Sequence, residues 1–293
     1  MAFDWDDIPF FLAVERAGRL ASAARRLRVS HTTVARHIDR LEEAMGTPLF
    51  DRTAEGLTLT QAGIALRDRA QRMEAAALDI ADTVCTEDKI VGSVRVGAPD
   101  GIGNAVLSRV LPGILSLHQG LEIELVPVPM THRLWKREVD IAISLDRPET
   151  GRLIMRKLID YDLRLYAAPA YLDQHGTPDG PDDLPAHPFV GYIDDLLYTP
   201  ELDFNRSFGA DLRIVYKSAT VQGQVDAVRA GAGLGVLPCF MADGLVPVLA
   251  DDLRFARTYW MLYPEDYRDL ARIRTVADYI HAEIQAMSAR FRA

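Results

Sequence analysis

The sequence predicts an α/β protein in two parts: an N-terminal winged helix-turn-helix with a long linker helix, and a larger C-terminal domain of alternating strands and helices. Three observations predict this fold. Residues 12–59 carry the pattern of a helix-turn-helix followed by a small hairpin. Residues 60–87 carry one long apolar repeat, and from Gly92 onward strand patterns alternate with helical patterns. A chain of 293 residues is long enough for two or more domains.

The first three helices are predicted from apolar spacing and from their end signals. The first helix ends at Ala17, and the next two span 20–27 and 31–44. Ser30 is a suitable N-cap for the third helix. Its apolar face consists of Val34, Ile38 and Leu41. The alanines of the second helix allow the close approach that so short a turn requires.

Positive charge is concentrated on these helices, although the whole chain has a net charge of −9. Residues 16–38 contain six arginines and no acidic residue. The arginines are Arg16, Arg19, Arg25, Arg26, Arg28 and Arg36. An acidic protein with one basic surface is expected to use that surface for a polyanion. The alternative is that these side chains only solvate the surface.

A wing and a long helix follow. The wing is expected at residues 50–59, with Arg52 at its base in reach of phosphate. The helix is expected from Thr60 to Glu87. Its apolar residues repeat at spacings of four and three, at Leu66, Ala70, Met73, Ala77, Ile80 and Val84. The charged residues on its other faces favour a dimer seam; the alternative is a helix packed on its own domain core.

The remaining sequence predicts an α/β sheet with crossover helices. Strands are expected at 93–97, 121–128, 139–143, 154–159, 162–167, 189–192, 212–216, 234–237 and 256–263. Helices are expected at 104–117, 134–138, 169–174, 221–230 and 269–290.

The chain resembles the LysR-type transcriptional regulators along nearly its whole length. The N-terminal resemblance rests on Phe10–Val14, Ser22–Leu27, Val29–Ser30, Thr33–Val34, Leu41–Glu43, Gly46–Arg52 and Leu59–Gly63. The C-terminal resemblance rests on Arg137–Ile143, Leu165–Leu172 and Ala230–Pro238. One departure concerns the residues after the turn serine, where the family commonly has Gln and then Pro or Ser and this chain has His31 and Thr32. The DNA sequence read by the third helix is therefore left open.

The resemblance implies a domain order and a set of partners. Residues 1–60 would form the DNA-binding domain, 61–88 the dimerisation helix and 89–293 a two-lobed, periplasmic-binding-protein-like effector domain. Lobe one would hold 92–163 and 265–293, and lobe two 164–262, with crossing strands near 163–168 and 260–264. The expected partners are double-stranded DNA, a small-molecule effector, further copies of the chain as a dimer or a tetramer built from two dimers, and RNA polymerase for an activator.

The expected DNA-binding residues lie on the helix pair and the wing. They are Arg19, Ser22, Ser30, His31, Thr32, Thr33, Arg36, His37, Arg40 and Arg52. Arginines and helix N-termini would hold phosphates, and a few side chains of the third helix would read base edges in the major groove. Thr33 and Arg36 are expected to be exposed, opposite the apolar face.

The expected effector-binding residues follow the strands of the C-terminal domain, where strand ends and helix N-termini converge. They are Asp100, Gly101, Thr131, Ser144, Asp146 and Thr220. The alternative for each is ordinary loop capping. Asp100 is expected to be ionised, since it opens a helix. With Ser144 at a position where relatives often have Arg, this favours a neutral or donor-rich ligand over a dicarboxylate.

Other classes of function are disfavoured. The glycines at 231–235 follow a helix and precede a strand, which is the reverse of a dinucleotide fingerprint. We find no zinc spacing and no nucleophile elbow, so neither a metal, a cofactor nor an enzyme is expected. The N-terminus lacks a basic signal sequence, and no apolar run reaches about 20 residues, which argues against a secreted solute-binding protein and a membrane span. Cys85 and Cys239 fall in different domains, so a reducing cytoplasm and no disulfide are expected, while redox sensing stays open.

Overall fold

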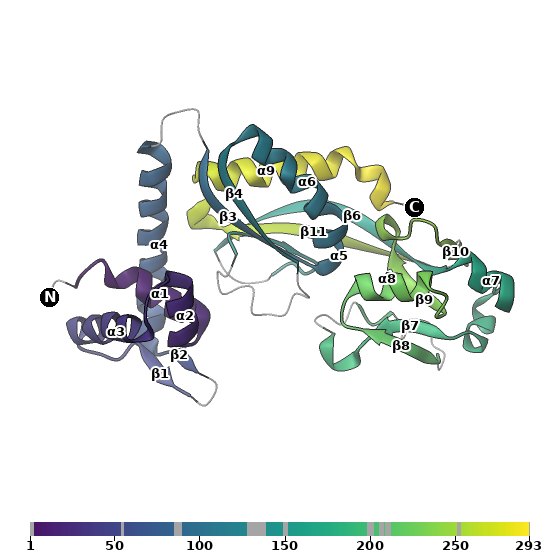
Figure 1. Cartoon of the computed structure of the whole chain (residues 1–293), viewed down its shortest axis with the longest axis horizontal. Helices are drawn as coiled ribbons and strands as arrows, with labels where there is room; N and C mark the ends of the chain where they lie inside the picture. The colour runs from purple at the N-terminus through teal and green to yellow at the C-terminus, as the bar shows by residue number, and fades with distance from the viewer. Residues whose placement is uncertain are drawn as a thin grey trace. The chain divides into compact units, whose positions relative to one another are not determined.

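A computed structural model describes residues 3–53, 56–84, 90–127, 139–148, 152–197, 202–204, 208, 212–250 and 253–292 (Figure 1). The chain divides into two compact units. The first comprises residues 1–88 and the second nearly all of residues 89–293. Among the described helices, none is both long enough and apolar enough to span a lipid bilayer.

The first unit opens with three helices that match the sequence prediction to within one residue at their C-terminal ends. They are α1 (Asp7–Ala17), α2 (Leu20–Leu27) and α3 (His31–Met45). Each ends at a residue in the left-handed region, namely Gly18, Arg28 and Gly46. This ending turns the chain sharply and satisfies the last carbonyl groups. Ala23 of α2 is fully buried, so the helices approach as closely as the small residues predicted.

The wing is an antiparallel pair, β1 (Phe50–Arg52) and β2 (Leu57–Leu59). Hydrogen bonds fix it to the helices at two points. Oε1 of Glu42 on α3 accepts from the backbone N–H of Leu49 at 2.6 Å and of Phe50 at 3.1 Å. The N–H of Leu57 donates to the carbonyl of Gly18 at 2.7 Å. The wing and the helix pair therefore form one body.

The long helix α4 (Gln61–Val84) supports both interpretations of its apolar repeat. Ala70 is fully buried, and Leu66 and Met73 pack on the core formed with α1 and α3. The first half of the apolar repeat therefore packs on the core of its own unit, which is the alternative to a dimer seam. Ile80 is 65% exposed. The predicted end at Glu87 lies outside the described residues.

The second unit is built on a mixed sheet, which the described residues form from nine strands. The strands are β3 (Val91–Ala98), β4 (Gly120–Pro127), β5 (Ile141–Ser144), β6 (Leu153–Ala167), β7 (Phe189–Tyr192), β8 (Ile214–Ser218), β9 (Leu234–Pro238), β10 (Val246–Val248) and β11 (Arg254–Pro264). Their order is β4-β3-β5-β11-β6-β9-β7-β8, with β10 paired to β6. The sequence did not predict β10.

The helices of this unit lie on the sheet. They are α5 (Asp100–Ile102), which continues through the π-turn η1 (Gly103–Leu107) into α6 (Ser108–Leu117), then α7 (Pro169–His175), α8 (Val221–Arg229) and α9 (Ala271–Ala286). A 3₁₀ turn, η9 (Ser288–Phe291), follows α9. The hydroxyl of Tyr279 on α9 donates to the carbonyl of Val110 at 3.3 Å, and α6 and α9 lie side by side (Figure 1). The helix expected at 134–138 lies outside the described residues.

Two long antiparallel strands, β6 and β11, connect the lobes. The expected strands 154–159 and 162–167 are one strand, β6, which pairs with β11 from Leu153 opposite Pro264 to Arg164 opposite Arg254. β11 joins β5 of lobe one at 260–262, and β6 joins β9 of lobe two at 163–166. The passage between lobes thus runs along 157–163 and 254–259, a few residues earlier on both strands than expected.

Candidate functional site

The start of α3 presents polar side chains from a well-capped first turn. Ser30 Oγ accepts from the backbone N–H of Thr33 at 3.1 Å, which confirms the predicted N-cap. His31, Thr32 and Arg36 are exposed. Thr33 is only half-exposed, contrary to expectation, and its hydroxyl lies 2.9 Å from Ser30 Oγ. The exposed part of the helix therefore begins with His31 and Thr32 and continues at Arg36.

Two expected DNA-binding residues, His37 and Arg40, are held by a buried carboxylate. Asp7 of α1 has no exposed surface; its Oδ1 lies 2.6 Å from His37 Nδ1, and Arg40 Nε donates to its Oδ2 at 2.9 Å. Phe10 stacks on the His37 ring with centroids 3.7 Å apart. Burial raises the pKa of Asp7, but the hydrogen bonds and charges of Arg40 and His37 outweigh this and lower it overall.

The Asp7 cluster, defined as Asp7, His37 and Arg40, ties α3 to the first turn of α1. No sequence pattern predicts this cluster, since the contact joins residues about 30 apart and Asp7 lies in an acidic stretch. His37 and Arg40 therefore have a structural role within the unit, whatever else they contact. The Arg40 side chain remains 47% exposed.

The remaining expected DNA-binding residues differ in their surroundings from Arg16, one of the six arginines of residues 16–38. Arg19, at the start of α2, and Arg52, at the end of β1, are exposed, and Ser22 Oγ lies 3.4 Å from an Arg25 guanidinium nitrogen. Arg16 instead forms a two-pronged ion pair with Glu74 of α4, with 3.0 Å between Nη1 and Oε1. Arg16 therefore joins α1 to α4 and does not belong to an open basic surface.

A small cavity lies between the lobes of the second unit. Pro99 and the first two residues of α5, Asp100 and Gly101, line it on one side. The described residues leave a volume of about 20 Å³, room for roughly one water molecule. The other described lining residues are Leu145, Tyr161, Leu163, Tyr192, Leu202, Phe204, Val221, Val236, Pro238 and Tyr259. We refer to this space as the interlobe cavity.

Asp100 spans the two lobes and carries an unsatisfied acceptor. Its Oδ2 accepts from the backbone N–H of Gln222 on α8 at 3.3 Å. Its Oδ1 is buried without a hydrogen-bond partner among the described residues, and the residue is 2% exposed. Burial raises the pKa of this carboxyl group, while backbone N–H groups of both lobes pull it down. The N–H groups of the helix start lower this pKa as expected, but desolvation is the larger effect and the pKa is raised overall.

The other expected effector-binding residues flank the interlobe cavity or lie outside the described residues. Ser144 is buried at the end of β5, where its Oγ accepts from the N–H of Asp146 at 3.1 Å, and Leu145 between them lines the cavity. Thr220 caps α8 by accepting from the N–H of Gly223 at 3.2 Å. These hydrogen bonds are ordinary loop and helix capping, which was the expected alternative to effector binding for both residues. Thr131 lies outside the described residues.

The aromatic lining was not predicted. Tyr161 and Tyr259 stack across the β6–β11 pair with centroids 4.3 Å apart, and burial strongly raises the pKa of Tyr161 and of Tyr192. Residues at alternate positions of a strand share one face, but which face meets a cavity depends on packing from distant parts of the chain.

Comparison with known proteins identifies the family. Residues 87–285 match the family described as LysR substrate binding domain, and residues 5–64 match that described as Bacterial regulatory helix-turn-helix protein, lysR family. The first unit thus has the architecture of a DNA-binding domain, and the second that of a LysR substrate-binding domain. The chain belongs to the LysR family of transcriptional regulators, which is not known as a family of enzymes.

Individual relatives agree over nearly full length. The chain is 27% identical to the probable HTH-type transcriptional regulator LtrA of Klebsiella pneumoniae, covering 97% of this chain and 96% of that protein. It is 29% identical to the Mau operon transcriptional activator of Paracoccus denitrificans, covering 94% and 95%. The structure of CrgA from Neisseria meningitidis shares the fold with a TM-score of 0.59 at 22% identity, covering 97% and 99%. Full-length LysG from Corynebacterium glutamicum, solved with bound effector Arg, shares it at 0.64 and 19%, covering 97% and 99%.

We predict that Asp7→Asn lowers the free energy of unfolding by about 1–3 kcal/mol near neutral pH, since it weakens charge-assisted hydrogen bonds to α3. The pKa of Asp7 is lower in the folded state than its unfolded value of 3.8. The ionised carboxylate therefore stabilises the fold fully above pH 3.8, and this contribution is lost as the pH falls through the folded-state pKa. The difference from the unsubstituted protein should therefore shrink in acid. Urea unfolding at neutral pH and at about pH 3 checks this, with the exposed neighbour Asp6→Asn as the control. An equal destabilisation at both pH values would contradict it.

Proposed function

We propose that this LysR-type regulator binds a two-fold symmetric DNA site as a homo-oligomer and senses a small molecule between the lobes of its second unit. The observation that carries the DNA-binding part is the capped first turn of α3, with His31, Thr32 and Arg36 exposed beside a wing that hydrogen bonds fix to the same body. A rigid helix with exposed polar side chains at its N-terminal end suits major-groove reading.

Within this proposal, the side chains divide into two roles. Arg19, Ser22 and Arg52 would contact phosphate and set the register. His31, Thr32 and Arg36 would meet base edges, while Ser30 and Thr33 hold the turn that presents them. His37 and Arg40 would act mainly by fixing α3 against α1 through Asp7.

Self-association would use the exposed part of α4. Ile80 is 65% exposed and belongs to the same apolar repeat that contributes Ala70 to the core nearer the start of the helix. A large apolar side chain left in solvent on a long helix supports pairing with a second copy. Two linked DNA-binding units gain affinity through effective concentration. A tetramer made of two such dimers, and contact with RNA polymerase if the protein activates transcription, are finer steps of the same proposal.

The effector would bind where Asp100 joins the lobes. The unsatisfied Oδ1 of Asp100 favours a ligand with a hydrogen-bond donor, and Tyr161 and Tyr259 offer it an apolar, aromatic surface. A cavity of about 20 Å³ is too small for a metabolite, so binding would require the lobes to separate. A ligand that favours the separated arrangement shifts the balance between the two and so alters DNA binding.

We expect Arg36→Ala to weaken binding to the operator by about 1–3 kcal/mol, the usual value of a good base contact. Thr33→Ala should weaken it by a similar amount, through loss of the Ser30 contact at the start of α3. Electrophoretic mobility shifts with the DNA upstream of the protein's own gene measure both. Arg268→Ala, an exposed arginine of the second unit, serves as the control. Unaltered affinity in both variants would show that α3 does not read the DNA.

We expect Ile80→Glu to convert the assembly to monomers and to abolish operator binding, because the seam would desolvate two like charges. Met73 is unsuitable for this test, since it packs on the core of its own unit. Light scattering measures the mass of the assembly. The control is Gln61→Glu, which adds the same charge at another exposed position of α4. Unchanged mass and DNA affinity for Ile80→Glu would rule out this seam.

We expect a thermal-shift screen of the full chain to find stabilisers among hydroxylated or amine-bearing metabolites before simple dicarboxylates, because the free Asp100 Oδ1 needs a donor. Asp100→Asn should reduce the shift. Asp269→Asn is the matched control, since Asp269 is exposed and lies outside the described lining. A dicarboxylate as the tightest ligand, unaffected by Asp100→Asn, would contradict the proposed pocket chemistry.

A further inference from the structure

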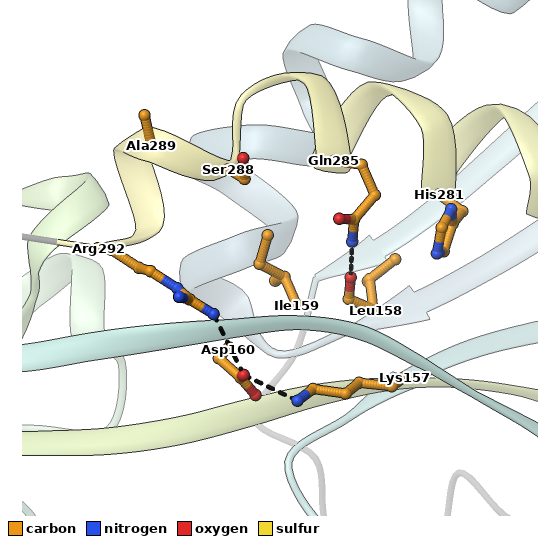
Figure 2. Close-up of a pocket in the computed structure, with 9 residues that line it drawn as sticks. All are labelled: Lys157, Leu158, Ile159, Asp160, His281, Gln285, Ser288, Ala289 and Arg292. Atoms are coloured by element: carbon orange, nitrogen blue, oxygen red, sulfur yellow. Dashed lines mark hydrogen bonds and ion pairs between the residues drawn. The ribbon is translucent and has the colours of Figure 1, made fainter.

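A second and larger pocket lies away from the interlobe cavity, between β6 and the C-terminal segment (Figure 2). Its volume is about 570 Å³, within the range of about 300–1,000 Å³ typical of small-molecule sites. β6 contributes residues 157–160. The opposite wall is formed by α9, η9 and the residue after η9, with His281, Gln285, Ser288, Ala289 and Arg292. We refer to it as the C-terminal pocket.

Two cations in this pocket share a single carboxylate. Lys157 Nζ lies 2.8 Å from Asp160 Oδ2, and Arg292 Nη2 lies 3.4 Å from the same oxygen. Asp160 Oδ1 accepts from the Thr258 hydroxyl at 2.7 Å. The Lys157 ammonium holds the pKa of Asp160 below its ordinary value, with Thr258 and Arg292 acting in the same direction and burial opposing them. Asp160 is therefore ionised at neutral pH, and the group of three carries one surplus positive charge.

The two cations remain accessible from the pocket. Their side chains are 54% and 65% exposed, and in Figure 2 both reach toward Asp160 from opposite walls. Ala289 and the hydrocarbon stems of Lys157 and Arg292 supply apolar surface, and Ser288 supplies a hydroxyl group. The pocket thus combines a positive end with an apolar wall.

A β-bulge shapes the floor of this pocket. The register of β6 against β11 shifts where Lys157 lies opposite Trp260 and Ile159 lies opposite Tyr259, so Leu158 has no partner in the ladder. The Gln285 amide donates to the freed Leu158 carbonyl at 2.5 Å. Bulges interrupt strand pairing and re-aim side chains, and they are frequent beside functional sites. Here the bulge lies between Lys157 and Asp160, the two charged residues that β6 contributes to the described lining.

We infer that the C-terminal pocket is a second small-molecule site, which takes a small organic carboxylate with an apolar body. The carboxylate would lie between Lys157 and Arg292, and the hydrocarbon part would lie along Ala289. Arginine and lysine on opposite walls suit one anionic head, and the surplus positive charge offsets the repulsion from Asp160. This site is distinct from the proposed effector site.

The C-terminal pocket and the interlobe cavity are joined by neighbouring residues. Asp160 lines the former, and the next residue, Tyr161, lines the latter. A second route runs through aromatic rings: Phe291, beside Arg292, packs on Phe240 at 4.7 Å, and Phe240 meets Tyr161 at 5.8 Å. A ligand that draws Arg292 away from Asp160 therefore acts on side chains packed against the interlobe cavity.

Isothermal titration of the full chain with hexanoate tests the inference. We expect saturable binding at one site per chain and little binding of the neutral analogue hexanamide. Lys157→Gln and Arg292→Gln should each weaken the affinity about tenfold, as loss of a charge-assisted contact implies. Ala289→Trp should abolish binding by filling the pocket without changing its charge. Arg290→Gln, on the same 3₁₀ turn but outside the lining, should leave the affinity unchanged.

Several results would overturn the inference. They are the absence of saturable hexanoate binding, equal binding of hexanamide, and an affinity that the double variant Lys157→Gln/Arg292→Gln leaves unchanged. Inorganic phosphate that binds while hexanoate does not would show that the apolar wall plays no part. Binding abolished by Asp100→Asn would place the carboxylate in the interlobe cavity instead. Circular dichroism of each variant confirms that the fold is retained.

Discussion

Strand pairing between β6 and β11 is the constraint on which the second unit depends. The two strands pair from Leu153 opposite Pro264 to Arg164 opposite Arg254, and each lobe attaches its own strands to one end of this pair. A movement of one lobe against the other deforms this pair, because both strands run through the passage and pair on either side of the bulge at Leu158. The tyrosines stacked on it line the interlobe cavity, and its bulge shapes the C-terminal pocket. Both candidate ligand sites are therefore built on the same pair of strands, and the geometry of this pair affects both.

Local features of the fold could be predicted from the sequence. Helix ends at Ala17 and Leu27, the Ser30 cap and the wing follow from periodicity, capping residues and turn residues that lie close together in the chain. Long-range features could not. The union of two expected strands into β6, the β10 pairing, the Asp7 cluster and the aromatic lining all depend on which distant segments meet. The packing of α4 could not be predicted for the same reason, because its apolar repeat is compatible both with a partner helix and with the core of its own unit.

Asp100 shows that neighbouring residues can indicate the position of a side chain without indicating the direction in which its pKa shifts. Its position after a strand predicted a cleft residue, and it does line the interlobe cavity. Its pKa was expected from the N–H groups of a helix start, which are a local property. Burial has the larger effect on this pKa, and burial cannot be predicted from the residues next to Asp100 in the sequence. Charge at an interlobe position is therefore a property of the assembled domain.

The internal ion pairs of the first unit also bear on how its DNA binding responds to salt. A protein cation that neutralises a phosphate releases condensed counterions, and the number of such contacts sets the slope of affinity against ionic strength. Arg16 is already neutralised by Glu74, and Arg40 by Asp7. Neither arginine gains the full electrostatic benefit of meeting a phosphate. The salt slope should therefore be shallower than a count of basic residues on these helices suggests, and less of the binding free energy should come from the entropy of released ions.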